Sequence, residues 1–234
     1  MKKTILLMYH SIGKVLNGEV GAGLYTVSEE NFRKQIECLK KLEDRDALIT
    51  FDDGCSTNYK YAFPVLKEAG FKAYFFIIVS KVGTRGYMNW EQIKEIRDAG
   101  MIIGSHGMTH QILTELKDSE IDYELNVSKR FLEDNLGHPV TCLSIPRGFY
   151  NDKIIDKAKD AGYEAVFTSN KNDKDGFRFG RIGVKANWDL KHFSRVVNNG
   201  FSFKASVEEI IKISSKKLFG AKNYDKIRTK ILGQ

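Results

Sequence analysis

Two carboxylates and two imidazoles in this 234-residue chain have the residue types and spacing of a hydrolytic metal site. Asp52 and Asp53 are adjacent and follow an apolar run. His106 and His110 are separated by three residues, which places both rings on one side of a helical or tightly turned segment. A divalent ion with a free carboxylate beside it is suited to hydrolysis. The pattern therefore indicates an enzyme.

Each half of this pattern has a structural explanation when it is taken alone. Two of five histidines can fall four residues apart by chance, and Asp-Gly is a common turn dipeptide. The apolar residues 47–51, however, predict a short buried strand, and adjacent side chains that leave a strand end point in different directions. One carboxylate can then face the ion while its neighbour faces a water. The combination favours the metal site.

These residues resemble the polysaccharide deacetylase family, carbohydrate esterase family 4, whose members carry Thr-Phe-Asp-Asp-Gly, here residues 50–54, and a later His-x-x-x-His. A third family motif, an apolar strand that runs into a proline and a glycine, is similar to residues 143–150. The resemblance spans about residues 4 to 200. It implies an α/β protein with a distorted (β/α)7 barrel, the NodB-like deacetylase fold.

The resemblance also implies the role of each residue in the site. Asp53, His106 and His110 correspond to the metal ligands, with Zn²⁺ expected and Co²⁺, Mn²⁺ or Ni²⁺ as alternatives. Three protein ligands leave open positions on the ion, as catalysis requires. Asp52 corresponds to the general base that takes a proton from the attacking water.

His10 is the expected general acid. Most family members carry this histidine in a C-terminal Leu-x-His motif; residues 190–192 have those letters here but open a predicted surface helix. The apolar residues 5–9 lead into His10 and are similar to the Tyr-His start of circularly permuted members. A structural loop histidine is the alternative for His10.

The chain departs from the family in the third motif, where many members have an arginine that pairs with the base and this chain has Ser144. Arg147 or Arg181 is expected to supply the cation instead, because a nearby guanidinium keeps an aspartate ionised and oriented. An ordinary surface arginine is the alternative for each. A backbone amide near Arg147 is also expected to stabilise the oxyanion.

Predicted strands and helices alternate along the chain, which indicates a parallel sheet. Strands are expected near residues 4–9, 47–51, 72–78, 101–104, 141–144, 164–167 and 181–184, and helices near 28–42, 57–69, 90–99, 118–136, 151–161, 189–198 and 206–218. Helix-ending glycines are expected at Gly70, Gly100 and Gly162. Because the candidate residues follow different strands yet must converge, a closed barrel is favoured over an open doubly wound sheet, with residues 11–27 as a loop over its mouth.

The chain is expected to form a barrel over residues 1–203, followed by a basic segment over 204–234. This segment has eight basic and three acidic residues and so carries five of the seven net positive charges. It is predicted to form a helix packed on the barrel. The alternative is a helix lying on an anionic membrane or beside a lipid-linked substrate. No nucleic-acid recognition motif accompanies the charge.

The first nine residues are too short for a secretory signal, and the sequence contains no membrane-spanning run. The protein is therefore expected in the cytoplasm or at the cytoplasmic face of the membrane. Cys38, Cys55 and Cys142 are widely spaced and are predicted to be reduced thiols.

The resemblance implies removal of an N-acetyl group from an amino sugar in a polysaccharide, an oligosaccharide or a lipid-linked precursor, within a cell-surface polysaccharide pathway. Trp90 and Tyr150 offer flat faces for a sugar ring, with core packing as the alternative. A deformylase or other amide hydrolase acting on a related sugar is a second interpretation. A non-catalytic carbohydrate-binding protein is a third; Ser144 and the displaced histidine favour it, and the complete set of ligands and base opposes it.

Overall fold

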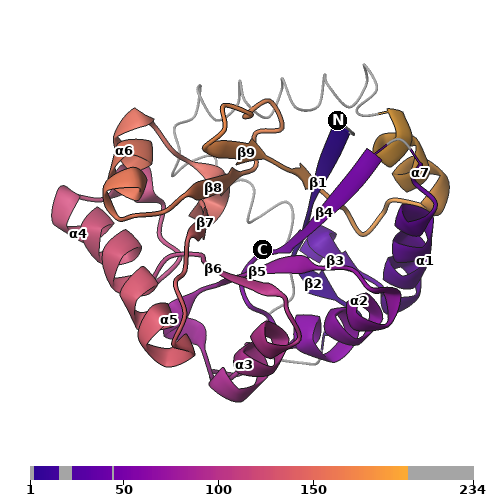
Figure 1. Ribbon diagram of the computed structural model, residues 1–234, viewed down its shortest axis with the longest axis horizontal. Coiled ribbons are helices and arrows are strands. Elements are labelled where there is room, and N and C mark those ends of the chain that lie inside the picture. Colours follow the sequence, from indigo (N-terminus) through magenta and orange to yellow (C-terminus); the bar gives the residue numbers. More distant parts are fainter. Residues whose placement is uncertain (1–2, 16–22, 44, 200–234) are drawn as a thin grey trace.

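The computed structural model describes residues 3–15, 23–43 and 45–199, which form a parallel sheet curled into a barrel with helices outside it (Figure 1). The strands are β1 (Lys3–Tyr9), β4 (Arg45–Phe51), β5 (Ala73–Ile77), β6 (Ile102–Ser105), β7 (Cys142–Ser144), β8 (Ala165–Thr168), β9 (Arg178–Gly180) and β10 (Ile182–Gly183). Their order in the sheet is β10-β1-β4-β5-β6-β7-β8-β9.

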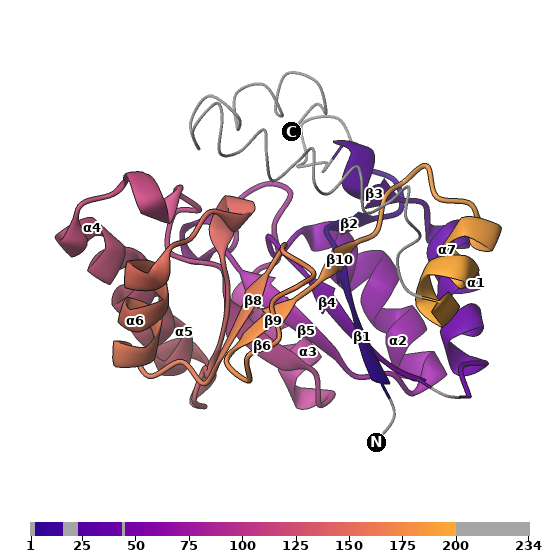
Figure 2. The same cartoon turned by 90° about the horizontal axis from the view of Figure 1, so that it is seen from above.

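One segment closes this sheet into a barrel. Only Arg181 separates β9 from β10, yet β9 pairs with β8 at one edge and β10 pairs with β1 at the other. Residues 178–183 therefore act as the seventh strand of the barrel, which pairs with both edges of the sheet (Figure 2). The predicted distorted (β/α)7 barrel is confirmed, and residue 181 lies at its seam.

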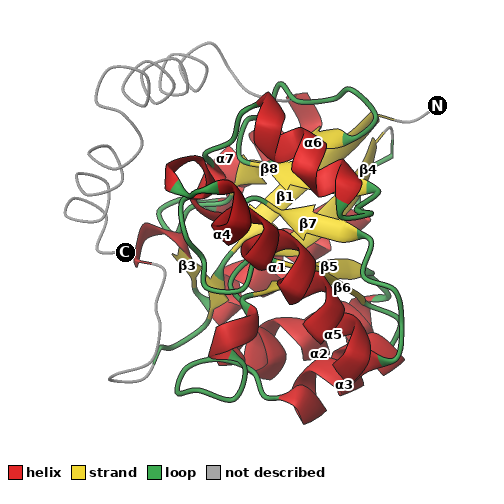
Figure 3. Cartoon of the chain, turned by 90° about the vertical axis from the view of Figure 1, so that its left-hand side faces the viewer, coloured by secondary structure: helices red, strands yellow, loops and turns green. Residues whose placement is uncertain are grey.

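The helices surround the strands (Figure 1). They are α1 (Glu29–Lys40), α2 (Phe63–Ala69), α3 (Trp90–Asp98), α4 (Asp118–Asp122), α5 (Ser128–Leu136), α6 (Asp152–Asp160) and α7 (Leu190–Asn199). Figure 3 shows α4, α5 and α6 side by side over one flank of the barrel. Within the described ranges, none of the helices combines the length and the apolar character that crossing a bilayer demands.

Short helical turns complete the connections: the 3-10 turns η1 (Gly23–Tyr25), η3 (Val79–Lys81), η4 (Leu113–Glu115) and η6 (Pro146–Gly148), and the π-helical turns η2 (Asn58–Ala62) and η5 (Tyr123–Val127). η2 runs directly into α2, and η5 joins α4 to α5. The helices predicted at 57–69 and 118–136 are thus continuous but contain wider turns. π-helical turns occur frequently at functional sites.

The other predicted elements are confirmed to within a few residues at their ends. Gly70, Gly100 and Gly162 have φ values of 72°, 82° and 77°, so each ends its helix in the left-handed conformation as expected. All three cysteines are free. The helix predicted at 206–218 and the basic segment 204–234 lie outside the described residues.

The expectation of a continuous loop over residues 11–27 is wrong at both ends of that range. β2 (Ser11–Ile12) pairs in parallel with β3 (Thr26–Val27), at the end of the barrel away from the N-terminus (Figure 2). Ile12 and Val27 are fully buried, so apolar burial holds this short sheet in place. A two-residue strand is too short to show the alternation from which strands are predicted.

Alternating residues of the strands belong to two hydrophobic clusters, one inside the barrel and one between the strands and the helices. In β5, Tyr74 and Phe76 belong to a cluster inside the barrel, whereas Phe75 and Ile77 belong to the larger core between strands and helices. The inner cluster also contains Leu6, Leu48, Cys142, Ala165, Phe167 and Phe179. The inner face of each strand is thereby identified, and it leads directly to the site.

Candidate active site

Five buried polar side chains continue the inner face of the barrel at the carboxyl ends of its strands. Each lies an even number of residues beyond an inner-face position: His10 after Leu6, Asp52 after Leu48, His106 after Gly104, Ser144 after Cys142 and Arg181 after Phe179. Side chains alternate between the two faces of a strand. A residue two or four positions beyond an inward-facing residue therefore also points inward, at the mouth of the barrel. The barrel therefore collects polar groups from five strands at one point.

Asp53, His106 and His110 form a cluster whose ligand atoms all lie within 4.8 Å of one another. The Asp53 Oδ1 atom is 3.5 Å from Nε2 of His106 and 3.6 Å from Nε2 of His110. Ligand atoms about 2.1 Å from a tetrahedral ion are separated by about 3.4 Å. This Oδ1 atom is buried and has no hydrogen-bond partner among the described residues. The three residues thus fit a divalent ion.

The two imidazoles reach this point in different ways. Nδ1 of His106 lies 2.8 Å from the carbonyl oxygen of Ser144, so as an N–H donor it leaves Nε2 facing Asp53. His110 follows a turn and not a helix, and its ring centroid is 4.8 Å from that of His106. The spacing correctly predicted two rings on one side of a tight turn.

Backbone strain among the described residues concentrates at this site. Among the residues that the structure describes, the only non-glycine residues with positive φ are Asp53 (74°), His110 (66°) and Arg147 (58°). The left-handed conformation is unfavourable for residues with a Cβ atom and persists where the surrounding structure imposes it. All three lie in loops that follow barrel strands, so the strain marks the loops that shape the mouth.

Asp52 forms a bidentate ion pair with Arg181, with Nη1–Oδ1 and Nη2–Oδ2 distances of 2.7 and 2.9 Å. The same guanidinium donates to Oγ1 of Thr50 at 2.9 Å and to Oγ of Ser144 at 2.8 Å. Ser144 in turn donates to Asp52 at 3.2 Å. Of the two arginines that the sequence left open as partners of Asp52, Arg181 occupies the position and Arg147 does not.

Two aromatic rings inside the barrel pack against this guanidinium. The Arg181 Cζ atom lies 5.4 Å from the ring centroid of Phe76 and 5.8 Å from that of Phe167. Burial by itself would raise the pKa of Asp52, but Arg181 and two neighbouring imidazoles outweigh it, so the pKa lies below its usual value. Asp52 is consequently held as a carboxylate although it is buried.

The remaining titratable groups respond to the same balance. Burial raises the pKa of Asp53, yet the surrounding imidazoles bring it well below its usual range. Burial lowers the pKa of His106, but the two carboxylates more than compensate and raise it. Burial dominates at His110 and lowers its pKa to about 3. Neutral His110 and ionised Asp53 are the forms that bind a metal ion.

His10 closes another side of the site. It is 9% exposed, its ring lies 5.0 Å from that of Tyr25, and its charge contributes to lowering the pKa values of both aspartates. His192, the alternative from the Leu-x-His letters, lies on α7 against Trp188 at 4.7 Å. The N-terminal histidine is therefore the one that lies near the carboxylates.

The three other singled-out residues have different surroundings. Arg147, in η6, lies near enough to contribute to lowering the pKa values of His110 and Tyr87, so it belongs to the mouth. Tyr150 donates from its hydroxyl to Oδ2 of Asp173 at 2.5 Å. Trp90 begins α3 and lies 6.1 Å from the ring of Phe131 on α5, which is a helix-packing contact.

Tyr87 is a site residue that the sequence did not single out. Its pKa is raised to about 12, first by burial and then by the charge of Asp53. It also pairs with Cys55 in a single antiparallel bridge, which fixes it beside the turn that follows Asp53. Tyr87 stands three residues before Trp90, but the sequence alone gives no reason to prefer Tyr87 over Trp90.

A buried glutamate braces the loop between the two candidate histidine ligands. Glu124, in η5, is 2% exposed and accepts hydrogen bonds from the backbone N–H groups of Met108 at 2.8 Å and Thr109 at 2.9 Å. It also accepts from the Thr109 hydroxyl. A Cβ atom on Gly107 would come within 2.7 Å of this carboxylate. The glutamate therefore fills the concave side of the loop.

Comparison with known proteins agrees with this fold. The polysaccharide deacetylase family model matches residues 39–166. YxkH of Bacillus subtilis (strain 168) is 32% identical over 180 residues, which cover 71% of this chain and 64% of that protein. A poly-beta-1,6-N-acetyl-D-glucosamine N-deacetylase of Staphylococcus epidermidis is 26% identical, over 77% of this chain and 78% of that protein.

Among solved structures, a polysaccharide deacetylase from Bacillus cereus superimposes with a TM-score of 0.74 at 26% identity, over 84% of this chain and 69% of that chain. The barrel is thus a known architecture of this class. The chain nevertheless spans less than two thirds of the length of the Bacillus subtilis relative.

Proposed function

Because the chain belongs to the polysaccharide deacetylase family, we propose that it is a metal-dependent hydrolase that removes the N-acetyl group from an amino sugar. The observation that carries the proposal is the convergence of Asp53, His106 and His110 beside the buried Asp52–Arg181 pair. A metal-ligand set and a separately held carboxylate are the two parts that amide hydrolysis at neutral pH requires.

Asp53, His106 and His110 would hold the ion, which when bound supplies a Lewis acid for the amide carbonyl and lowers the pKa of a water. We expect Zn²⁺, with Co²⁺, Mn²⁺ or Ni²⁺ as alternatives, since two imidazoles and a carboxylate suit each of them. The Ser144 carbonyl oxygen accepts from Nδ1 of His106 and so orients the ring toward the proposed ion.

Asp52 takes the proton of the attacking water in this mechanism. Arg181 keeps it ionised and fixes the plane of its carboxylate through two parallel hydrogen bonds. His10, near both carboxylates, then protonates the departing amine, which leaves poorly as an anion. The turn at Arg147 supplies polar groups for the developing oxyanion.

The substrate is proposed to be an N-acetylated glucosamine unit of a polysaccharide, an oligosaccharide or a lipid-linked precursor. The name of the Staphylococcus epidermidis relative supports this class of glycan. Tyr150 and Trp90 stay predicted sugar contacts, and Tyr87 joins them because it lies beside Asp53. The Asp52–Arg181 pair also weakens the non-catalytic interpretation, since another strand supplies the cation that Ser144 lacks.

Metal analysis beside an acetate-release assay on N-acetylglucosamine oligosaccharides tests the proposal. Asp53→Ala and His106→Ala are expected to lose both bound metal and activity. Asp52→Asn is expected to keep the metal and lose turnover by about 100-fold or more, the usual contribution of a general base. His138→Ala, at an exposed histidine, serves as the control and keeps both. Normal turnover of Asp52→Asn would remove the base assignment.

A further inference from the structure

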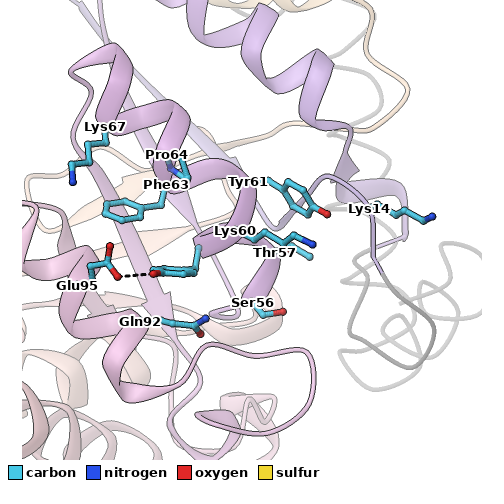
Figure 4. A pocket seen from close by; sticks show the side chains of 11 residues that line it. Lys14, Ser56, Thr57, Lys60, Tyr61, Phe63, Pro64, Lys67, Gln92 and Glu95 are labelled. Atoms are coloured by element: carbon cyan, nitrogen blue, oxygen red, sulfur yellow. Dashed lines mark hydrogen bonds between the residues drawn. The ribbon is translucent and has the colours of Figure 1, made fainter.

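A groove with a volume of about 590 Å³ lies outside the barrel, where η2 and α2 face α3 (Figure 4). Its lining includes three lysines (Lys14, Lys60 and Lys67), three aromatic residues (Tyr59, Tyr61 and Phe63) and the hydroxyl-bearing Thr57. We call it the lysine groove. Its volume falls in the range of small-ligand sites. No part of the mechanism above uses it.

The aromatic rings form a flat and rigid wall. Tyr59 and Phe63 lie nearly parallel, with ring centroids 5.9 Å apart and an interplanar angle of 22°. The Tyr59 hydroxyl donates to Oε2 of Glu95 on α3 at 2.5 Å, which ties η2 to the opposite helix (Figure 4). Flat apolar rings complement the hydrogen-bearing face of a pyranose and lose little entropy when they bind it.

The charges of the groove favour an anionic ligand. Three lysines line it against one glutamate, Glu95. Among the described residues neither Lys14 nor Lys67 forms an ion pair; the Lys67 ammonium lies 5.9 Å from the Phe63 ring centroid. Lysine ammonium groups bind phosphate and carboxylate as point charges. A neutral sugar would gain little from this excess of cations.

A polar group in the wall lacks a partner. Thr57 is 3% exposed, and its hydroxyl has no hydrogen-bond partner within the described parts of the chain. Unpartnered buried hydroxyls are uncommon because losing hydration costs free energy. Because this oxygen is itself covered, the lysines and the aromatic rings indicate a ligand, and this group does not.

Two residues of the groove follow candidate active-site residues closely in the sequence. Thr57 lies four residues after Asp53, and Lys14 lies four residues after His10. A Cβ atom on Gly13 would come within 2.5 Å of the Tyr61 ring, so the backbone beside Lys14 packs directly on η2. At no more than about 3.6 Å per residue, four residues separate each pair by no more than about 14 Å along the backbone, a distance that a glycan chain of a few sugar units spans.

We infer that the lysine groove binds an anionic sugar unit, carrying a carboxylate or a phosphate, of the same glycan whose N-acetyl group reaches Asp53, His106 and His110. The inference rests on the proposed function, and it specifies the substrate further as an anionic glycan. Attraction between the lysines and the sugar anion is expected to weaken as salt is added, since the groove is open to solvent.

Binding measured by calorimetry on the metal-loaded protein tests the inference independently of hydrolysis. The probes are a hyaluronan hexasaccharide for the carboxylate, N-acetylglucosamine 6-phosphate for the phosphate, and neutral chitohexaose. The test variant is Lys14→Glu with Lys60→Glu. The matched control, Lys41→Glu with Lys191→Glu, makes the same change of net charge at exposed lysines elsewhere.

The groove variant is expected to bind at least one anionic probe about tenfold or more weakly, and chitohexaose as the parent does. The control is expected to match the parent for all three probes. Equal weakening in the control, or unchanged binding of both anionic probes by the groove variant, overturns the inference. Acetate release from chitohexaose is read in parallel, so a failure of the proposed deacetylase activity appears separately from a failure of the groove.

Discussion

A single arginine supplies the cation that was expected beside Asp52. Ser144 stands where the resemblance led us to expect an arginine, and Arg181 reaches the Asp52 carboxylate from the closing segment of the barrel. Ser144 then serves as a bridge, since it accepts from Arg181 and donates to Asp52. The positive charge expected beside Asp52 is therefore present, and it comes from a segment far along the chain.

Arg181→Met is expected to destabilise the protein by about 3–5 kcal/mol, because it leaves the carboxylate of Asp52 buried without its partner. Both side chains are at most 4% exposed, so solvent screens the pair little. Urea unfolding at neutral pH measures the loss. Arg33→Met removes an exposed pair with Glu29 and is the control, with an expected cost below about 1 kcal/mol.

The cost should also depend on pH. The folded-state pKa of Asp52 is lowered, so its contribution to stability is present above the unfolded pKa of about 3.9 and is lost as the pH falls through the folded value. The difference between parent and Arg181→Met should therefore narrow in acid. A difference of the same size at pH 3 and pH 7 would contradict the pairing argument.

At the scale of elements, a π-helical turn on the outside of the barrel supports a loop at its mouth. η5 widens the α4–α5 helix at the position from which Glu124 reaches the backbone of Met108 and Thr109. This loop joins the two histidines of the candidate metal site. The geometry of the cluster thus depends on a residue that does not belong to it.

Glu124→Gln is expected to lower metal affinity about 10- to 100-fold, the usual effect of changing a residue that orients a ligand. A glutamine presents one oxygen and one NH₂ group to donors that all require acceptors. Equilibrium dialysis against Zn²⁺ measures the change.

Glu133→Gln is the matched control for this variant. Glu133 lies on α5 of the same helical run and also accepts from a backbone N–H, that of Val140, but it is remote from the cluster. Its loss should affect stability and leave metal affinity unchanged. Parental affinity in Glu124→Gln would show that the loop holds its shape without the carboxylate.

In the whole molecule, the segment that closes the barrel also supplies a residue of the candidate active site. The segment 178–183 pairs with β8 on one side and with β1 on the other, and Arg181 lies between the two pairings. The backbone is tightly packed there, since a Cβ atom on Gly180 would come within 2.1 Å of the Asn170 carbonyl oxygen. Opening this seam would remove the partner of Asp52.

Gly180→Ala is expected to destabilise the protein by about 3 kcal/mol, because the new methyl group meets backbone that cannot move aside. Gly183→Ala in the same segment is the control: its nearest contacts are side-chain atoms of Met8 and Tyr25, at 3.1 Å, and the Met8 methyl can shift. Thermal unfolding of both variants tests the difference. Equal stability of the two would contradict the tight seam.

Much of the molecule could be predicted before any coordinates. Apolar runs and helix-ending glycines located the strands and helices, because local burial patterns and left-handed glycines act over a few residues. The same runs placed Asp52, Asp53 and His10 at strand ends. The missed β2–β3 pair shows the limit, since two-residue strands carry no period.

Other features depended on contacts between distant segments. Sequence reasoning kept both Arg147 and Arg181 as partners for Asp52, because 95 and 129 residues of separation carry no distance information. It singled out Trp90 as a candidate sugar contact and did not single out Tyr87, which lies near Asp53. It assigned no role to Glu124, since an acidic residue in a helix is ordinarily solvated.

Residue type and local periodicity were enough to identify the longer strands, the helix-ending turns and the chemical groups at the barrel mouth. Contacts between distant segments were needed to establish which arginine holds Asp52, which residue braces the histidine loop and where a charged groove lies. Those choices depend on how the sheet closes, and closure sums many weak contacts over the whole chain that no single segment encodes.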